Sequence, residues 1–272
     1  MKTRIITGAV LVPVLIAVLV WAPKILVAVL LAVLCAIAAV ELLHNTGMMK
    51  HPRLLSYAAL TAALVPLWCH FGMHFVWGQL GLLLLFGLLF MEIMLSHVKL
   101  KFEKVSVCFT AALLIPYMLS ALVRILGGDF GRYLVFIPFV AAFASDTGAY
   151  FIGSKFGKHK MAPVISPKKS VEGLFGGVAC AILGMLLYAL VLQLAFGLTV
   201  SYLSAALYGL IGSFVGVFGD LCFSVIKRQT GVKDYGNIFP GHGGVLDRFD
   251  SVLVVAPVME LLLILLPMVV KK

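Results

Sequence analysis

The chain has 272 residues, of which 62% are hydrophobic and only 12% charged, and its formal net charge is +10. A soluble domain is about half apolar and a quarter charged, so this composition excludes an ordinary water-soluble protein. Lysines and arginines in short loops between apolar runs are typical of membrane orientation and of binding to anionic headgroups or substrates, so we expect no nucleic-acid partner.

Apolar runs, each about as long as a helix that crosses the hydrocarbon of a bilayer, follow one another along the chain. Helices are favoured because backbone groups cannot remain unpaired in lipid. The sequence therefore predicts an all-α, polytopic integral membrane protein with about nine transmembrane helices. The predicted spans are residues 5–22, 25–43, 54–72, 78–95, 105–123, 133–152, 174–196, 202–222 and 252–270.

The positive charges predict an orientation. If the N-terminus lies in the cytoplasm and the nine spans alternate, sixteen of the 21 lysines and arginines fall on the cytoplasmic side. This excess follows the positive-inside rule. The terminal Lys271 and Lys272 are the exception, because this topology places them outside.

The acidic residues divide the chain. They are sparse before residue 140, whereas later ones lie at or beside the cytoplasmic ends of spans. Two polar loops, 153–173 and 224–251, face the same side. We predict scaffold helices over 1–132 and a catalytic transmembrane region over 133–272.

Carboxylates at helix ends are the first candidates for chemistry. Asp220 and Ser224 are four residues apart at the end of one apolar run, so they share a helix face. Asp247 and Asp250 are three apart where the last run begins. Magnesium prefers such hard oxygen ligands together with water and substrate phosphates, so the three aspartates predict a magnesium site, with room for a second metal ion. The alternative is that they only cap helices at the interface.

Glycines and cations near these carboxylates predict phosphate binding. Gly243 and Gly244 allow backbone N–H groups to approach a phosphate just before a helix begins. Lys168 and Lys169 are adjacent point charges after Ser166 and Pro167. The remaining candidate cations are Lys227, Arg228, Lys233 and Arg248. The alternative is that all of these cations are orientation signals.

Four further residues have open roles. Asp146 lies deep in an apolar run, where an acid indicates function: it could bind a metal ion, hold a lysine, contact ribose, or only stabilise packing. His242 could contact phosphate or simply support its loop. Glu41 and Glu92, near cytoplasmic span ends, are interpreted as interface residues rather than ligands.

The longest motif is Ser224-x-x-Lys227-Arg228, then Lys233-Asp234, then Pro240-Gly-His-Gly-Gly-x-x-Asp247-Arg248-Phe-Asp250. It resembles the signature of the phosphatidate cytidylyltransferases, also called CDP-diacylglycerol synthases. The runs 166–173 and 145–150 resemble two further motifs of that family. Ser170 and Val171 depart from it, because many members have Thr and Trp there.

The resemblance implies an enzyme that transfers CMP from CTP to phosphatidate with magnesium, releasing pyrophosphate for phospholipid synthesis. It implies catalytic roles for Asp220, Asp247, Asp250, Lys227 and Arg248, and substrate binding by the other candidates: Ser166, Lys168, Lys169, Ser224, Arg228, Lys233, His242, Gly243, Gly244 and Asp146. The expected partners are CTP, phosphatidate and membrane lipid, with a homodimer left open. The expected location is the bacterial inner membrane, with the active site facing the cytoplasm.

Three rival functions remain. A transporter would use charges near the bilayer centre and often two repeats, whereas here no repeat is seen and the charges lie toward one face. A CDP-alcohol phosphotransferase would carry a run of Asp-Gly and Ala-Arg followed by spaced aspartates, which is absent. A CTP-dependent polyprenol kinase could share the cytidine loop but not the long motif that follows it.

Overall fold

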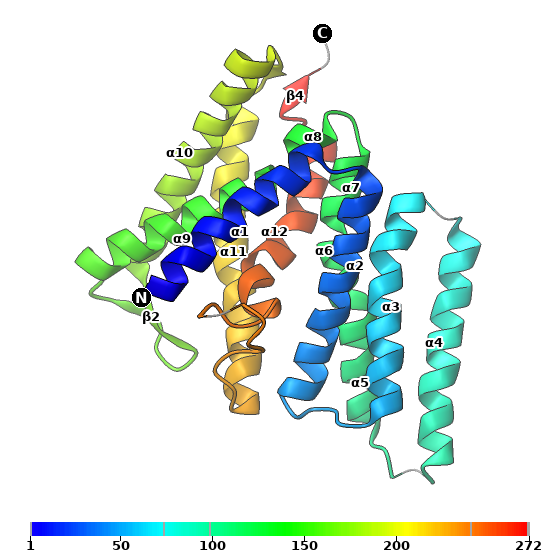
Figure 1. Ribbon diagram of the computed structural model, residues 1–272. Helices are drawn as coiled ribbons and strands as arrows, with labels where there is room; N and C mark the ends of the chain where they lie inside the picture. The colour runs from blue at the N-terminus through cyan, green and yellow to red at the C-terminus, as the bar shows by residue number, and fades with distance from the viewer. Residues whose placement is uncertain (1, 73, 98, 240, 271–272) are drawn as a thin grey trace. The chain divides into compact units, whose positions relative to one another are not determined.

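The protein is an assembly of helices with two very small sheets, as the computed structural model in Figure 1 shows. The structure describes residues 2–72, 74–97, 99–239 and 241–270. The first half contains α1 (Lys2–Trp21), α2 (Lys24–Val40), the π-helix η1 (Glu41–Asn45), α3 (Pro52–Phe71), α4 (Phe75–Leu95), α5 (Phe102–Phe109), the π-helix η2 (Thr110–Leu114), α6 (Ile115–Leu119), α7 (Ala121–Gly127) and α8 (Gly131–Leu134). The second half contains α9 (Ile137–Phe156), β1 (Lys160–Ala162), β2 (Ser166–Ser170), α10 (Val171–Phe196), β3 (Thr199–Val200), α11 (Tyr202–Thr230), α12 (Leu246–Leu265) and β4 (Val269–Val270).

Helices that could span a membrane account for most of the predicted runs. Within the described residues, seven helical segments are long and apolar enough: Lys24–Asn45, Pro52–Phe71, Phe75–Leu95, Phe102–Gly127, Gly131–Phe156, Val171–Phe196 and Tyr202–Thr230. The apolar part of α1, Ala9–Trp21, is shorter. Helix α12 carries more charged residues than these segments, namely Asp247, Arg248, Asp250 and Glu260. The helical membrane fold is therefore confirmed, whereas the number nine is not.

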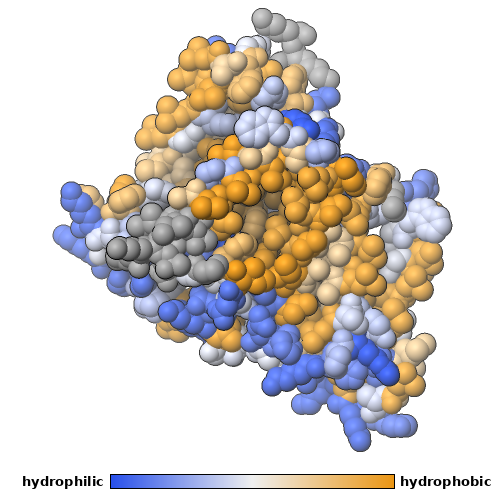
Figure 2. Space-filling view, viewed as in Figure 1, coloured by the Kyte–Doolittle hydropathy of each residue, from blue (hydrophilic) through white to orange (hydrophobic). Residues whose placement is uncertain are grey.

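The outer faces of these helices are apolar. In α4, Leu82, Leu83, Leu84 and Phe86 are each at least half exposed. Figure 2 shows broad hydrophobic areas over the helices, with hydrophilic residues gathered mainly near helix ends and loops. Leaving so much apolar surface in water is unfavourable, so lipid is the solvent that these faces fit. The protein is thus an integral membrane protein.

The described chain divides into two compact units. The first combines Met1–Gly127 with Thr230–Arg248, and the second combines Gly128–Gln229 with Phe249–Lys272. This division rests on contacts alone, so the scaffold and catalytic roles assigned to 1–132 and 133–272 stay a prediction. The stretch Thr230–Arg248 packs with the first half of the chain.

In the first unit, α2 packs along α3, and both contact the broken helix α5–η2–α6–α7. Small residues allow the close approach: Ala28, Cys35 and Ala39 of α2 and Ala58 of α3 are fully buried. The last turn of α2 widens into η1, a five-residue π-helix. Single π-helical turns of this kind are rare and often occur at functional sites.

In the second unit, α9 and α10 pack at glycine contacts. A Cβ atom on Gly148 of α9 would lie 2.5 Å from the Cβ atom of Cys180 in α10. A Cβ atom on Gly177 would lie 2.9 Å from the carbonyl oxygen of Ser145. The hydroxyls of Ser145 and Ser213 are 2.7 Å apart, which joins α9 to α11. Small residues at such crossings bring backbones together without needing a hydrophobic driving force between helices.

The two predicted polar loops are shorter than expected. Much of 153–173 forms the antiparallel β1–β2 hairpin, which pairs Lys160 with Ser170 and Ala162 with Ser166. Strands β3 and β4 form a second small pair. In 224–251, α11 continues to Thr230 and α12 begins at Leu246. The extension of α11 is physically reasonable, since Lys227 and Arg228 favour the negative end of the helix dipole.

Candidate functional site

The first cluster of candidate residues lies in the second unit, where β2 meets α11. The Lys169 ammonium is 2.5 Å from Oδ2 of Asp220 and also donates to the Val217 carbonyl oxygen at 3.4 Å. The Ser224 hydroxyl donates to Oδ1 of Asp220 at 3.3 Å. The predicted shared face of Asp220 and Ser224 is therefore present. Because both side chains of the ion pair are only about a fifth to a quarter exposed, water screens their attraction less than at an open surface.

Asp250 lies beside this cluster within the same unit. Its carbonyl oxygen would be 2.9 Å from a Cβ atom on Gly219, so only glycine lets α12 approach α11 so closely. The Asp250 carboxyl group interacts electrostatically with Asp220, Lys227 and Asp146. Carboxylates that repel one another beside a lysine are suited to share a cation.

Asp146 lies halfway along α9, and it is exposed rather than buried. The Asp250 carboxyl group senses the charge of Asp146, which places Asp146 among the acids of the second unit. The functional role of Asp146 stays a prediction, beside the alternative that the acid only stabilises packing.

The β1–β2 hairpin is tied to α11 by an arginine. Nε of Arg228 donates to the carbonyl oxygen of Ile165 at the hairpin turn, at 3.0 Å. Successive strand residues point to opposite faces, so Lys169 reaches Asp220 while Lys168 remains exposed. Ser166, at the start of β2, is partly exposed. At the other end of β2, the Ser170 hydroxyl accepts from the Gly173 N–H at 3.2 Å and caps α10.

The glycine-rich loop before α12 belongs to the first unit and is organised by Asp247. Oδ2 of Asp247 accepts from the N–H groups of Tyr235, at 2.7 Å, and Gly244, at 3.0 Å. The carboxylate is buried, with 5% exposure. Gly243 has φ +85°, and a Cβ atom there would lie 2.8 Å from Oδ2 of Asp247. Glycine is thus required at 243 by backbone conformation and by space.

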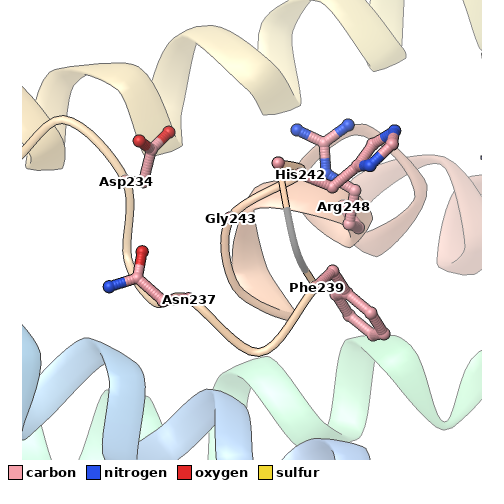
Figure 3. Close-up of a pocket in the computed structure, with 7 residues that line it drawn as sticks. Asp234, Asn237, Phe239, His242, Gly243 and Arg248 are labelled. Atoms are coloured by element: carbon pink, nitrogen blue, oxygen red, sulfur yellow. The ribbon is translucent and has the colours of Figure 1, made fainter. Parts of the chain in front are cut away.

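A cavity of about 450 Å³ opens in this loop, lined by Asp234, Asn237, Phe239, Gly241, His242, Gly243 and Arg248. Figure 3 shows His242 and Arg248 together on one side, with Asp234 and Asn237 across the loop. Nδ1 of His242 is buried without a hydrogen-bond partner in the described part of the chain. An unpaired buried nitrogen beside an arginine favours a bound polar ligand.

Four predicted positions remain. Lys233 is exposed on the loop, and Lys227 is half-buried near the end of α11. Gly244 is buried. Pro240, part of the predicted motif, lies outside the described residues.

The three aspartates predicted to bind magnesium have the right chemistry, but the structure does not bring all three together in one cluster among the residues that it describes. No group of three or more His, Cys, Asp or Glu side chains that could hold a metal ion is found in the described ranges. Asp247 belongs to the first unit, and Asp220 and Asp250 belong to the second. Because magnesium typically uses one or two carboxylates together with water and phosphate, Asp220 and Asp250 fit the ion by themselves.

Sequence reasoning missed the role of Glu41. The sequence suggested that Glu41 is an interface residue. In the structure it is only 2% exposed, and it accepts hydrogen bonds from the N–H groups of Val245 and Leu246, at 3.0 Å each. The signal that could have revealed it is an acid at the end of an otherwise apolar run, where an unpaired charge is costly. Its partners are more than 200 residues away, so no local pattern identifies them.

Taken together, these features define a helical membrane protein with carboxylates, lysines and a glycine-rich turn suited to a phosphate-bearing ligand. A sequence model of the cytidylyltransferase family matches residues 2–266. The chain belongs to this family, which confirms the resemblance found in its motifs.

Several relatives are named phosphatidate cytidylyltransferase. The Bacillus subtilis protein is 37% identical over 278 residues, covering 97% of this chain and 98% of the relative. A Staphylococcus epidermidis protein is 47% identical over 133 residues, and one from Staphylococcus aureus is 45% identical over 134 residues. In these two alignments the chain spans about half the length of the relative, 49% and 50%.

Proposed function

We propose that this protein transfers CMP from CTP to phosphatidate, giving CDP-diacylglycerol and pyrophosphate. A phosphate oxygen of phosphatidate attacks the α-phosphorus of CTP, and the bond to the β-phosphate oxygen breaks. The attacking oxygen is already anionic near neutral pH, so no strong general base is needed. The barrier comes from charge repulsion and from the leaving pyrophosphate.

The observation that carries the proposal is the Lys169–Asp220 ion pair, at 2.5 Å. It brings together two segments that the motifs assign to the same chemistry, the strand after Ser166 and the helix that carries Ser224 and Lys227. A lysine held by an acid is available to exchange that partner for a phosphate when substrate arrives.

The loop of the first unit supplies a second set of phosphate donors. Arg248, His242 and the backbone of Gly243 line the cavity of about 450 Å³. Pockets for small ligands typically measure about 300–1,000 Å³. Arginine binds phosphate through paired N–H donors, and a helix N-terminus favours an anion. We assign this cavity to part of the nucleotide.

Magnesium is the proposed cofactor, held by Asp220 and Asp250 of the second unit. When bound, the ion offsets phosphate charge and stabilises the leaving pyrophosphate. In the same unit, Lys169 and Lys227 orient the phosphates and balance the remaining charge.

The lipid substrate bears on where the protein lies and how each substrate reaches its site. Each methylene transferred from lipid to water costs about 0.8 kcal/mol, so phosphatidate stays in the bilayer and its headgroup reaches the site from the side. CTP approaches from the cytoplasm. We place the protein in the bacterial inner membrane with its site facing the cytoplasm. A homodimer remains a hypothesis that mass measurement in lipid nanodiscs tests.

The decisive assay uses two samples of CTP, one labelled at the α-phosphate and the other at the γ-phosphate. Purified protein in lipid should move an α-phosphate label, but no γ-phosphate label, into a lipid product when phosphatidate and magnesium are present. Transfer of the γ-label would identify a kinase instead. Consumption of added CDP-diacylglycerol with release of CMP, seen only when an alcohol is supplied, would indicate a phosphotransferase. No label in lipid, with a solute crossing the membrane, would favour a transporter.

A further inference from the structure

Glu41 is the most deeply buried carboxylate among the described residues. It lies where α2 becomes η1, in the half of the chain expected to serve only as scaffold. None of the described lysines and arginines pairs with it; both of its oxygens are taken by backbone N–H groups. A buried carboxylate of this kind is costly to keep unless its hydrogen bonds serve a purpose.

Those hydrogen bonds cap the start of α12. Oε1 accepts from Val245 and Oε2 from Leu246, each at 3.0 Å. The first N–H groups of a helix have no partner inside the helix, and the positive end of its dipole favours a carboxylate. Glu41 is therefore a helix cap supplied by a distant segment, immediately before Asp247 and Arg248.

The fit around Glu41 is tight. A Cβ atom on Gly236 or on Gly244 would lie 2.3 Å from Oε1. Both glycines are needed because the carboxylate fills the space that a side chain would take. The same π-helix makes a second contact, since Nδ2 of Asn45 donates to the carbonyl oxygen of Tyr235 at 2.7 Å.

These contacts form a network with Asp247. The carbonyl oxygen of Tyr235 accepts a hydrogen bond from Asn45, and the N–H of Tyr235 donates one to Asp247. The N–H of Gly244, which lies beside Glu41, also donates to Asp247. The π-helix η1 thus holds Tyr235 on one side of the glycine-rich loop and Val245 and Leu246 on the other.

We propose that Glu41 is a positioning residue that fixes the glycine-rich loop and the start of α12, and so holds Asp247 and Arg248 ready for the substrate's phosphates. This inference rests on the proposed function for its catalytic consequence. Its structural content, that Glu41 keeps the loop closed, stands independently.

The test compares Glu41→Gln with a matched control, Glu92→Gln. Glu92 is also buried at the end of a helix in the first unit, but it contacts Tyr57 and Arg53, far from the loop in sequence. Glutamine keeps the size of glutamate. The NH₂ group of glutamine would face a backbone N–H, so one of the two hydrogen bonds to the start of α12 is lost.

The first measurement is hydrogen exchange of the intact protein in lipid without substrate. Peptides covering 241–250 should exchange at least about tenfold faster in Glu41→Gln, and at the wild-type rate in Glu92→Gln. Equal exchange of these peptides in all three proteins would overturn the proposal. This arm needs no CTP chemistry, so it stands even if the wild-type protein fails to use CTP.

The second measurement is turnover per folded molecule. In Glu41→Gln, kcat/KM for CTP should fall at least about tenfold, whereas Glu92→Gln should stay within about threefold of wild type. Glu41→Asp combined with Gly244→Ala should recover part of the loss of Gly244→Ala alone, because the shorter acid leaves room for the methyl group. Equal kinetics for Glu41→Gln and Glu92→Gln, or no recovery in the double variant, would contradict the positioning role.

Discussion

Lys168 and Lys169 are neighbours in the chain with different surroundings. Lys169 is paired with Asp220, whereas Lys168 is exposed. Arg248 lines the cavity of the loop. Lys101, just before α5, is equally cationic and exposed, but it belongs to none of the three motifs and has no glycine-rich loop beside it in sequence. If these cations served only to orient the chain in the membrane, removing Lys168 or Arg248 would have the same effect as removing Lys101.

We predict that they are not. Lys168→Ala or Arg248→Ala should lower kcat/KM for CTP about tenfold or more, because a charge-assisted hydrogen bond contributes about 1.5–3 kcal/mol. Lys101→Ala should change it little. The variants are compared at equal amounts of folded protein in the same lipid. Similar behaviour of all three would mean that the loop cations only orient the chain.

The carboxylates carry a separate prediction. Asp220→Asn keeps size but removes the charge that pairs with Lys169 and suits magnesium, so turnover should fall at least about a hundredfold. Asp250→Asn and Asp247→Asn should behave likewise. Activity is measured against magnesium concentration, and near-normal turnover in Asp247→Asn at saturating magnesium would remove that residue from the metal site. For Asp247 a loss also includes the loop bonds to Tyr235 and Gly244.

At the scale of elements, close helix crossings in the second unit depend on glycine. Gly148→Ala would bring a methyl group within 2.5 Å of Cys180 and 2.7 Å of the Gly176 carbonyl oxygen. Backbone must then move, and overpacking of this kind typically costs about 1–3 kcal/mol. We expect a lower melting temperature for Gly148→Ala in detergent.

Gly87→Ala in α4 is the matched control, because a Cβ atom there meets nothing within 4 Å. Alanine favours a helix over glycine by roughly 0.5–1 kcal/mol, so this variant should keep or raise the melting temperature. A fall of the same size in both variants would show that the α9–α10 crossing tolerates a methyl group.

At the scale of the whole molecule, the alternation of spans fixes which side each loop faces. Among the described residues, seven helical segments meet the length and hydropathy expected of a span, and α1 and α12 also fall on predicted runs. If both cross, the N-terminus and the C-terminus lie on opposite sides. We propose, from the positive-inside rule, that the β1–β2 hairpin and the loop before α12 each face the cytoplasm.

A reporter fused after Lys272 tests this arrangement. We expect the reporter to be active only outside the cytoplasm, and a second reporter in the 153–173 region to be cytoplasmic. A C-terminal reporter that proves cytoplasmic would mean an even number of spans.

Much of this architecture could be predicted from the sequence. The apolar runs determined the helices, because the length needed to cross hydrocarbon and the need to pair every backbone group leave few alternatives. The spacing of Asp220 and Ser224 determined their shared face, because a helix repeats every 3.6 residues. The motifs around Asp247 pointed to the family because they are local in sequence.

Tertiary structure decided what local spacing cannot express. Lys169 meets Asp220 across 51 positions of sequence, and Glu41 caps a helix that begins 205 positions later. The burial of Asp247 and its two backbone hydrogen bonds follow from a loop that packs on the first half of the chain. Such pairings depend on which surfaces bury each other's unpaired backbone groups and charges, and that is a property of the packed chain rather than of any one segment.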